Sequence, residues 1–575
     1  MLHDLYTLHG ENLQENPWQS YPRPQMKRES YVNLNGQWDF AATDRDTFPE
    51  EYPQKILVPF CPESLLSGLS QPIKPGSYLY YRRALELPPR ASGGRVLLHI
   101  GAADQIATVY VNGIACGSHV GGYNAFAVDI TDALKEENQL VIRVFDDLRN
   151  QRLPYGKQSL RRGGMWYTPV SGIWQTVWLE VVPEQCIQRI DVKTTLEKAV
   201  VTVTPPLDGR VLCQGKAYPL TGGKAEIAPE NPELWTPETP VLYDFTVETE
   251  TDRVESYFAL RTLSVKEYQG IPRLCLNGRP YFFHGLLDQG YWSDGIYTPA
   301  EPACFAEEIL AMKALGFNTL RKHIKVEPEQ FYYDCDRLGM IVFQDMVNNG
   351  PYSFFRDTLL PTVGIQRRND KHLHRDKAAR EAFLTCMEET VQQLGNHPCI
   401  CCWTIFNEGW GQFDSGACYR RLKALDSSRF IDSTSGWFRG RQTDVDSRHV
   451  YFTPWSTLQP GEKPLVLSEF GGYTYAAEGH LFNPEKAYGY KTCKDLNDYQ
   501  AAVAALYRQK VLPAVERGLC AAIYTQTADV EDEINGILTC DRKVCKADPA
   551  AMTRIASNLW AAFWKSCGLQ DRTEP

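Results

Sequence analysis

Two glutamates end apolar, strand-like runs of the chain. Glu408 stands in "CCWTIFNEGWGQF" (401–413), directly after Asn407, and Glu469 stands in "PLVLSEFGG" (464–472). Two carboxyl groups about 5–5.5 Å apart can cleave a glycosidic bond with retention of configuration. One attacks the anomeric carbon, and the other protonates the departing oxygen. We therefore expect these two side chains to meet in one pocket.

The region around them alternates apolar runs with amphipathic helical stretches such as "AEEILAMKALG". Eight strand-like runs alternating with helices over residues 266–575 predict a (β/α)8 barrel. These runs are "YFFHGLL", "FNTLRKH", "MIVFQDM", "CICCWTIFNE", "FIDSTSG", "RHVYFTP", "PLVLSEF" and "AAIYTQT". In such barrels the C-terminal ends of the strands carry the active site, so Glu408 and Glu469 face each other across the mouth.

Other polar residues end the same runs and become candidate substrate-binding residues. Asn407 can hydrogen-bond a sugar 2-hydroxyl, a contact that strengthens in the transition state. Aromatic side chains near the runs could stack on sugar rings. The polar candidates are His284, Asp288, Arg321, His323, Asp345, Ser435, His449, Tyr451 and Gln526, and the aromatic ones are Trp410, Trp437, Tyr451, Tyr291 and Trp292.

Structural and metal-binding roles are the alternatives to this chemistry. Either glutamate alone could cap a strand or pair with an arginine such as Arg321. His284, His323 and a glutamate could in principle hold a metal, but no H-E-x-x-H spacing supports it. We expect neither a metal nor a cofactor.

The first half of the chain has a different pattern. Short β-branched segments separated by Gly, Asn, Asp and Pro predict a jelly-roll-like β-sandwich over residues 1–183, with a hairpin turn at Asn112-Gly113. A further all-β stretch over residues 184–265 predicts a small immunoglobulin-like sandwich. The expected order is therefore sandwich, sandwich, barrel.

Composition limits the partners and the compartment. A net charge of −10 argues against nucleic-acid binding, and no apolar run reaches the length of a membrane span. Seventeen cysteines, of which Cys399, Cys401 and Cys402 share one strand-like run, favour a reducing compartment. The N-terminus has no signal pattern, so we expect a cytoplasmic location. The expected partner is a small glycoside or oligosaccharide. A homo-oligomer stays open, because symmetric interfaces leave no sequence period.

Taken together, the motifs resemble glycoside hydrolase family 2, which includes β-galactosidases, β-glucuronidases and β-mannosidases. The resemblance covers nearly the whole chain from about residue 30. It rests on "GQWDF" (36–40), "YYRR" (80–83), "VYVNG" (109–113), "GGYNAF" (121–126), "SGIWQTVWLE" (171–180), "FHG" (283–285), "FNTLRKH" (317–323), "NEGWG" (407–411) and "SEFGG" (468–472). It implies that Glu408 is the general acid/base, that Glu469 is the nucleophile and that Asn407 contacts the sugar.

Two departures from the family pattern bear on the site. His323 follows Arg321 by two residues instead of the usual three. Family glucuronidases carry an Asn-x-Lys pair whose lysine meets the substrate carboxylate, but "EDEINGILTCDRK" has Glu533 and Asn535 there. A glutamate would repel a uronate, although Lys543 or Lys546 could fold back to replace the missing cation. We expect Glu533 and Asn535 to bind the substrate instead, by hydrogen bonds to the hydroxyls of a neutral sugar.

The resulting prediction is an exo-acting, retaining β-glycosidase for a neutral sugar, with a galactoside favoured. The alternatives are glucuronidase-type activity and a carbohydrate-binding or scaffold protein without turnover. Transglycosylation, in which a second sugar intercepts the covalent intermediate, also stays open.

Overall fold

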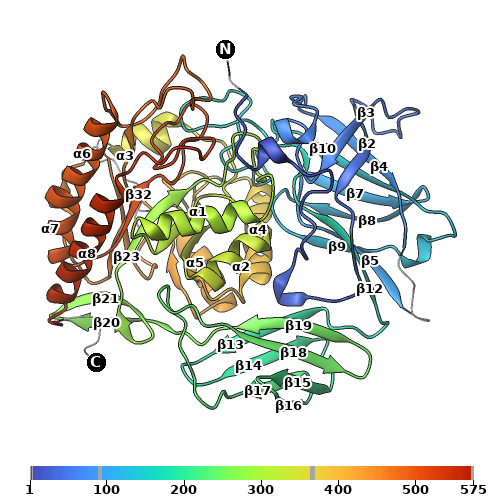
Figure 1. The fold of residues 1–575 in the computed structure, drawn as a ribbon, viewed down its shortest axis with the longest axis horizontal. Helices are drawn as coiled ribbons and strands as arrows, with labels where there is room; N and C mark the ends of the chain where they lie inside the picture. The colour runs from blue at the N-terminus through green and yellow to red at the C-terminus, as the bar shows by residue number, and fades with distance from the viewer. Residues whose placement is uncertain are drawn as a thin grey trace.

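The computed structural model describes residues 2, 4–87, 94–362, 369–438, 440–451 and 453–570. Within them the chain forms two β-sandwiches followed by a barrel, in the predicted order. Figure 1 shows the N-terminal sandwich beside the barrel and the middle sandwich below both. Among the described helices, none combines the length and the apolar character that crossing a membrane requires.

The N-terminal sandwich consists of a six-stranded and a four-stranded antiparallel sheet, which enclose a core of their own. The first sheet runs β3 (Gln54–Val58), β2 (Gly36–Thr43), β4 (Ser77–Ala84), β10 (Gln139–Asp146), β7 (Ile106–Val111) and β8 (Ile114–Val120). The second runs β1 (Tyr31–Asn33), β12 (Val177–Val182), β5 (Arg95–Ile100) and β9 (Phe126–Asp129). Asn112 and Gly113 turn the chain between β7 and β8, both at positive φ (53° and 80°), as the hairpin prediction requires.

The middle sandwich has seven strands in two antiparallel sheets around a second core. They are β13 (Arg189–Thr194), β14 (Ala199–Thr204) and β17 (Lys224–Ile227), and β16 (Lys216–Leu220), β15 (Gly209–Cys213), β18 (Tyr243–Thr249) and β19 (Arg253–Phe258). Trp235 fixes this sandwich to the barrel, because its buried indole N–H donates to the Asp336 carbonyl over 2.8 Å.

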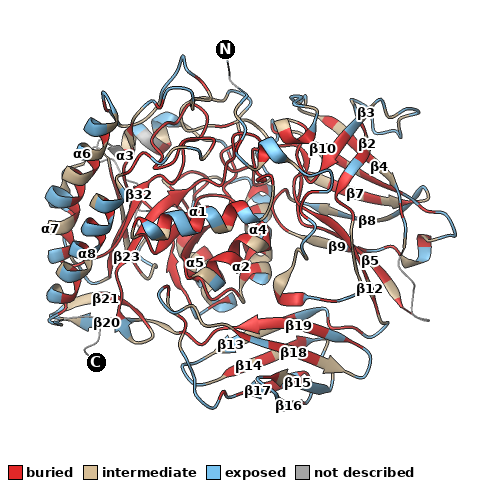
Figure 2. Cartoon of the chain, viewed as in Figure 1, coloured by how far each residue is buried: buried red, intermediate tan, exposed pale blue. Residues whose placement is uncertain are grey.

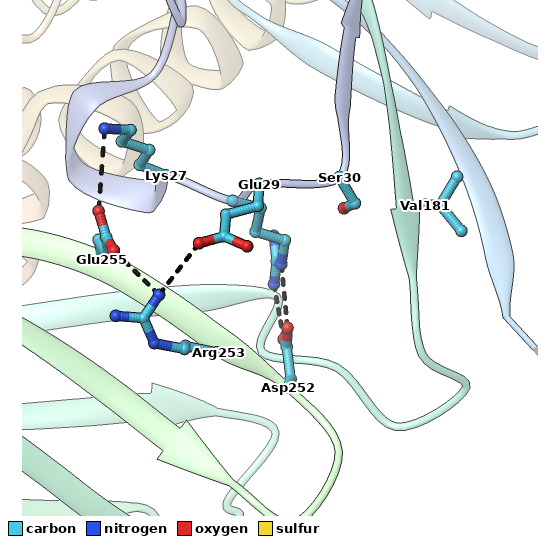
Figure 3. A pocket seen from close by; sticks show the side chains of 8 residues that line it. Lys27, Glu29, Ser30, Val181, Asp252, Arg253 and Glu255 are labelled. Atoms are coloured by element: carbon cyan, nitrogen blue, oxygen red, sulfur yellow. Dashed lines mark hydrogen bonds and ion pairs between the residues drawn. The ribbon is translucent and has the colours of Figure 1, made fainter. Parts of the chain in front are cut away.

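A charged seam joins the two sandwiches (Figure 3). Arg28 pairs with Asp252 at 2.8 Å, and Arg253 pairs with Glu255 at 3.0 Å, with Lys27 3.8 Å from the same glutamate. These groups line a small hollow, but their charges neutralise one another. We therefore assign this hollow to the domain junction.

The barrel contains all eight predicted strands, and every neighbouring pair is parallel. In ring order they are β27 (Phe430–Asp432), β26 (Ile400–Thr404), β25 (Ile341–Asp345), β24 (Thr319–Lys322), β23 (Phe283–Asp288), β32 (Leu519–Thr525), β29 (Leu465–Gly471) and β28 (Asp446–Val450). No ladder joins β27 to β28 in the described part of the chain, so the barrel is nearly closed.

Helices surround the barrel and shield its strands, which are buried on both faces (Figure 2). Aspartates begin three of the helices and accept hydrogen bonds from first-turn N–H groups: Asp376 at α4, Asp495 at α6 and Asp548 at α8. The helices are α1 (Ala303–Ala314), α2 (Glu329–Leu338), α3 (Leu360–Thr362), α4 (Lys377–Leu394), α5 (Ser415–Leu425), α6 (Leu496–Leu506), α7 (Leu512–Glu516) and α8 (Pro549–Ser566). Preceding the barrel, β20 (Leu263–Tyr268), β21 (Ile271–Leu276) and β22 (Arg279–Pro280) form a small sheet.

Candidate active site

Glu408 and Glu469 meet at the mouth of the barrel. Glu408 follows β26, and Glu469 lies within β29. A carboxylate oxygen of each, together with a ring nitrogen of His449, lies within 4.8 Å of the others. This separation fits the close carboxyl pair of retaining glycosidases, since inverting enzymes keep theirs about 6.5–9.5 Å apart.

The backbone of Glu408 adopts an unusual conformation. Its φ is +51°, and the next residue, Gly409, has a φ of +75°. A non-glycine residue in this left-handed region costs free energy and is held there by its surroundings. The Glu408 N–H donates to the Ser435 carbonyl over 2.9 Å, which fixes the turn that follows β26.

His449 lies between the two carboxyl groups. Its Nδ1 is 2.8 Å from Glu408 Oε1, and its Nε2 is 3.0 Å from Ser435 Oγ and 3.3 Å from an Arg321 nitrogen. Burial lowers the pKa of His449 to about 4, so the ring is neutral at neutral pH. Because Arg321 can only donate, the ring proton belongs on Nδ1, where it is donated to Glu408.

Glu469 accepts hydrogen bonds on both oxygens. Arg321 donates to Oε1 over 3.0 Å, and the Tyr451 hydroxyl donates to Oε2 over 2.9 Å. Burial raises the pKa of Glu469, while the positive charge of Arg321 acts in the opposite direction. Its side chain is 7% exposed and that of Glu408 is 19% exposed. Glu408 is therefore the carboxyl group more open to water.

Arg321 connects the predicted polar residues around the pair. It forms a bidentate ion pair with Asp345 (3.0 Å for each bond), and Asp345 also lies 2.8 Å from His323 Nδ1. Arg321 donates to Asn407 Oδ1 over 2.9 Å as well. This bond fixes the amide so that its nitrogen can serve a substrate hydroxyl.

After β32, the predicted residues Gln526, Glu533 and Asn535 form a hydrogen-bonded chain. Gln526 donates to Asn535 over 2.8 Å, and Asn535 donates to Glu533 over 3.0 Å. The second oxygen of Glu533 accepts a hydrogen bond from the Tyr167 hydroxyl of the N-terminal sandwich. Burial raises the pKa of Glu533, an effect that Tyr167 opposes.

Aromatic side chains lie beside these groups. Trp437 packs edge-on against His449, with ring centres 5.7 Å apart, and Tyr451 stacks on Tyr490 at 3.9 Å. Trp410 packs against Trp166 of the N-terminal sandwich at 5.1 Å. Trp437 and Tyr451 thus lie beside the carboxyl pair, through His449 and Glu469, and Trp410 lies beside the N-terminal sandwich.

Four candidates have structural contacts instead. His284 does not reach the mouth: its ring contacts the Gly316 carbonyl (3.0 Å) and the Tyr507 hydroxyl (3.3 Å), and burial lowers its pKa to about 4. Asp288 forms an ion pair with Lys322 at 2.6 Å. Tyr291 packs on Tyr167 and Tyr297, and Trp292 packs on Phe305 under the Arg542 guanidinium.

Sequence reasoning missed the residues that the N-terminal sandwich contributes. Lys157, Trp166 and Tyr167 come from the long connection between β10 and β11 (Gly172–Ile173), and Tyr490 follows β29. The motif "GGMWYTP" around Trp166 was a visible aromatic signal, but nothing in the sequence assigned it to the barrel.

The carboxyl pair and His449 also have the ligand spacing of a metal site, the one such cluster found among the described residues. Arg321 opposes this use, because its guanidinium already lies 3.0 Å from Glu469 and 3.3 Å from His449. A cation there would meet a fixed positive charge.

Three family models match successive parts of the chain. They are "Glycosyl hydrolase 2 galactose-binding domain-like" over residues 73–161, "Glycosyl hydrolases family 2" over 187–261, and "Glycosyl hydrolases family 2, TIM barrel domain" over 271–557.

Similar proteins include a β-glucuronidase of Felis catus, 25% identical over 79% of this chain and 80% of its own length. A β-galactosidase of Thermoanaerobacter pseudethanolicus is 24% identical over 70% of this chain and 55% of its own length.

Among solved structures, an uncultured Clostridium sp. β-glucuronidase matches with a TM-score of 0.72 at 18% identity, covering 93% of this chain and 99% of its own. A β-galacturonidase of Eisenbergiella tayi bound to galacturonate matches with a TM-score of 0.67 at 20% identity, over 94% and 99%. At these identities the structural likeness establishes the shared fold.

Proposed function

The chain belongs to glycosyl hydrolase family 2 and is a glycoside hydrolase, and on this premise we propose that it is an exo-acting β-glycosidase that works with retention through Glu469 and Glu408. The observation that carries the proposal is the approach of the two carboxyl groups to within 4.8 Å. That distance leaves room for a sugar carbon, but not for a water molecule between the sugar and the base.

In the first step, a carboxylate oxygen of Glu469 bonds to the anomeric carbon as the bond to the leaving oxygen breaks. The electron pair stays on the leaving oxygen, which takes the proton of Glu408. In the second step, the Glu408 carboxylate takes a proton from water. The water oxygen then bonds to the anomeric carbon and releases Glu469, so that the enzyme is restored.

The division of roles is supported by what each carboxyl group contacts. Glu469 is oriented by donors on both oxygens, which suits an ionised nucleophile. Glu408 accepts one hydrogen bond on Oε1 from His449, which leaves Oε2 to carry the exchangeable proton. Its greater exposure suits a group that exchanges protons with water.

The experiment follows the product and the intermediate. An aryl β-glycoside panel identifies a substrate, and NMR of the first-formed product should show the β-anomer. An activated 2-deoxy-2-fluoro analogue of that sugar should trap a covalent adduct on the peptide that contains Glu469. The variant E469A serves as the unlabelled control. An α-anomeric product, or a label on another residue, would contradict the proposal.

A further inference from the structure

A long connection of the N-terminal sandwich lies across the barrel mouth. After β10 the chain reaches Tyr155 and Gly156, whose N–H groups donate to the Asn348 carbonyl over 3.1 and 3.3 Å. The Tyr155 ring packs on Trp410 at 5.4 Å, and the Tyr167 N–H donates to the Lys157 carbonyl over 3.0 Å. The backbone just before Lys157 is therefore fixed against the barrel, and Lys157 itself is hydrogen-bonded to Tyr167 of the same connection.

Lys157 is a largely buried residue of this connection. The residue is 8% exposed, and its Nζ lies 5.8 Å from the centre of the Trp166 ring, which itself packs on Trp410. Burial raises the pKa of Glu408, Glu469 and Glu533, and the positive charge of Lys157 acts to lower all three pKa values. The ammonium is thus close to the groups that surround the sugar site.

Within the described parts of the chain, no hydrogen bond or ion pair is found on this ammonium. A lysine ammonium has three donors, so this one can still donate to the acceptors of a ligand. Glu533, the carboxylate expected to repel an anion, already accepts from Tyr167 and Asn535. The ammonium of Lys157 is therefore available to a ligand.

Three other cations of the barrel, Arg321, Lys543 and Lys546, are already paired. Each nitrogen of the Arg321 guanidinium donates to an acceptor, and the two lysines that could have folded back toward the substrate have partners elsewhere. Arg321 donates to Asp345, Asn407, Ser468 and Glu469. Lys546 donates to Asp529 and to the Ile534 carbonyl. Lys543 donates to Glu11.

We propose that Lys157 is the specificity-determining residue that pairs with a carboxylate on the substrate, so that the enzyme acts on hexuronic acid glycosides. The proposal rests on the proposed glycosidase function. The expectation of a neutral sugar was based on the missing lysine at position 535, and Lys157 supplies a cation from another domain. An unpaired uronate in a partly desolvated pocket would be strongly disfavoured, so this single ion pair should separate acidic from neutral sugars.

The test compares kcat/KM for aryl β-glucuronide and β-galacturonide with the matched β-glucoside and β-galactoside. The wild type should prefer one uronide over its neutral counterpart by about 100-fold or more. K157M should lower kcat/KM for the uronide by about 100-fold and kcat/KM for the neutral glycoside far less. The uronide-to-neutral ratio of kcat/KM should therefore decrease. K157R should retain part of the preference, because the positive charge remains.

Arg161 provides the matched control, because it lies on the same connection but is exposed. R161M should change the uronide-to-neutral ratio of kcat/KM by less than about 2-fold. A wild-type preference for the neutral sugars, or equal losses on both classes in K157M, would overturn the role of Lys157 alone. No turnover of any β-glycoside, with no covalent trapping on Glu469, would instead remove the glycosidase function and this inference with it.

Discussion

Tyr167 of the N-terminal sandwich donates its hydroxyl proton to Glu533 of the barrel mouth, across 366 positions of the chain. The same tyrosine ring packs on Tyr291 of the barrel at 4.7 Å. Since Glu533 also holds Asn535, this contact makes the sandwich part of the wall of the site. We therefore expect domain packing and substrate recognition to be coupled.

Removing that hydroxyl should weaken catalysis more than stability. Y167F leaves Glu533 with one donor fewer, so its carboxylate loses orientation, and we expect kcat/KM to fall by about 10-fold. The free energy of unfolding should fall by about 1 kcal/mol. Y243F, which removes a hydroxyl bonded to the Glu233 backbone in the middle sandwich, is the control and should leave kcat/KM unchanged. Equal kinetics for both variants would argue against the coupling.

Substitution of Glu469 and of Glu408 should give distinct results. E469A should abolish turnover of every substrate, because no glycosyl-enzyme can form. E408A should still form the intermediate from substrates with good leaving groups, which need little protonation, and should then stall. External azide should restore turnover in E408A and yield a β-glycosyl azide, detectable by mass spectrometry. Azide rescue of E469A instead, or of neither variant, would refute the assigned roles.

Much of the fold could be predicted because its signals are local. Barrel strands are buried on both faces and have no polar side, so their apolar residues stand together in the sequence. Each of the eight apolar runs forms a barrel strand. Asn112-Gly113 formed its hairpin because both positions need positive φ. The end of a strand also indicated which face of the barrel Glu408 and Glu469 occupy.

The parts of the site that escaped prediction depend on long-range packing. His284 lies early in β23 and points toward Tyr507, which a run of apolar letters does not reveal. Lys157 and Tyr167 reach the site only because a connection of another domain folds over the barrel. The roles of Glu408, Glu469 and Asn407 stay predictions until the variants are measured.

The pH profile should reflect two carboxyl groups whose pKa values burial raises. Activity should decrease when the pH drops below the pKa of Glu469, because this carboxyl group must be ionised to attack. Burial raises that pKa, so the acidic limb should lie above the ordinary value of 4.5. Activity should fall again as Glu408 loses its proton, at a pKa that burial also raises. Removing the hydrogen bond from His449 disfavours the ionised form of Glu408. In H449A the alkaline limb should therefore move to higher pH, at reduced kcat.

The control for this profile is H119A, because His119 stacks on Phe126 in the N-terminal sandwich at 4.5 Å. Its pH profile should overlay that of the wild type. An alkaline limb that moves to lower pH in H449A would mean that His449 stabilises the protonated acid, contrary to the tautomer assigned above.

The contact between the middle sandwich and the barrel should carry much of the stability of the chain. The buried Asp336 carboxylate accepts from the Tyr257 hydroxyl (2.7 Å), the His397 ring (2.7 Å) and the Cys399 N–H (2.8 Å). D336A would leave three buried polar groups without this acceptor, and each such loss costs about 1–3 kcal/mol. We expect the free energy of unfolding in urea to fall by about 3 kcal/mol or more. D191A removes an exposed aspartate paired with Arg189, so it should change stability by less than about 0.5 kcal/mol. Similar urea midpoints for the two variants would show that this contact does not hold the domains together.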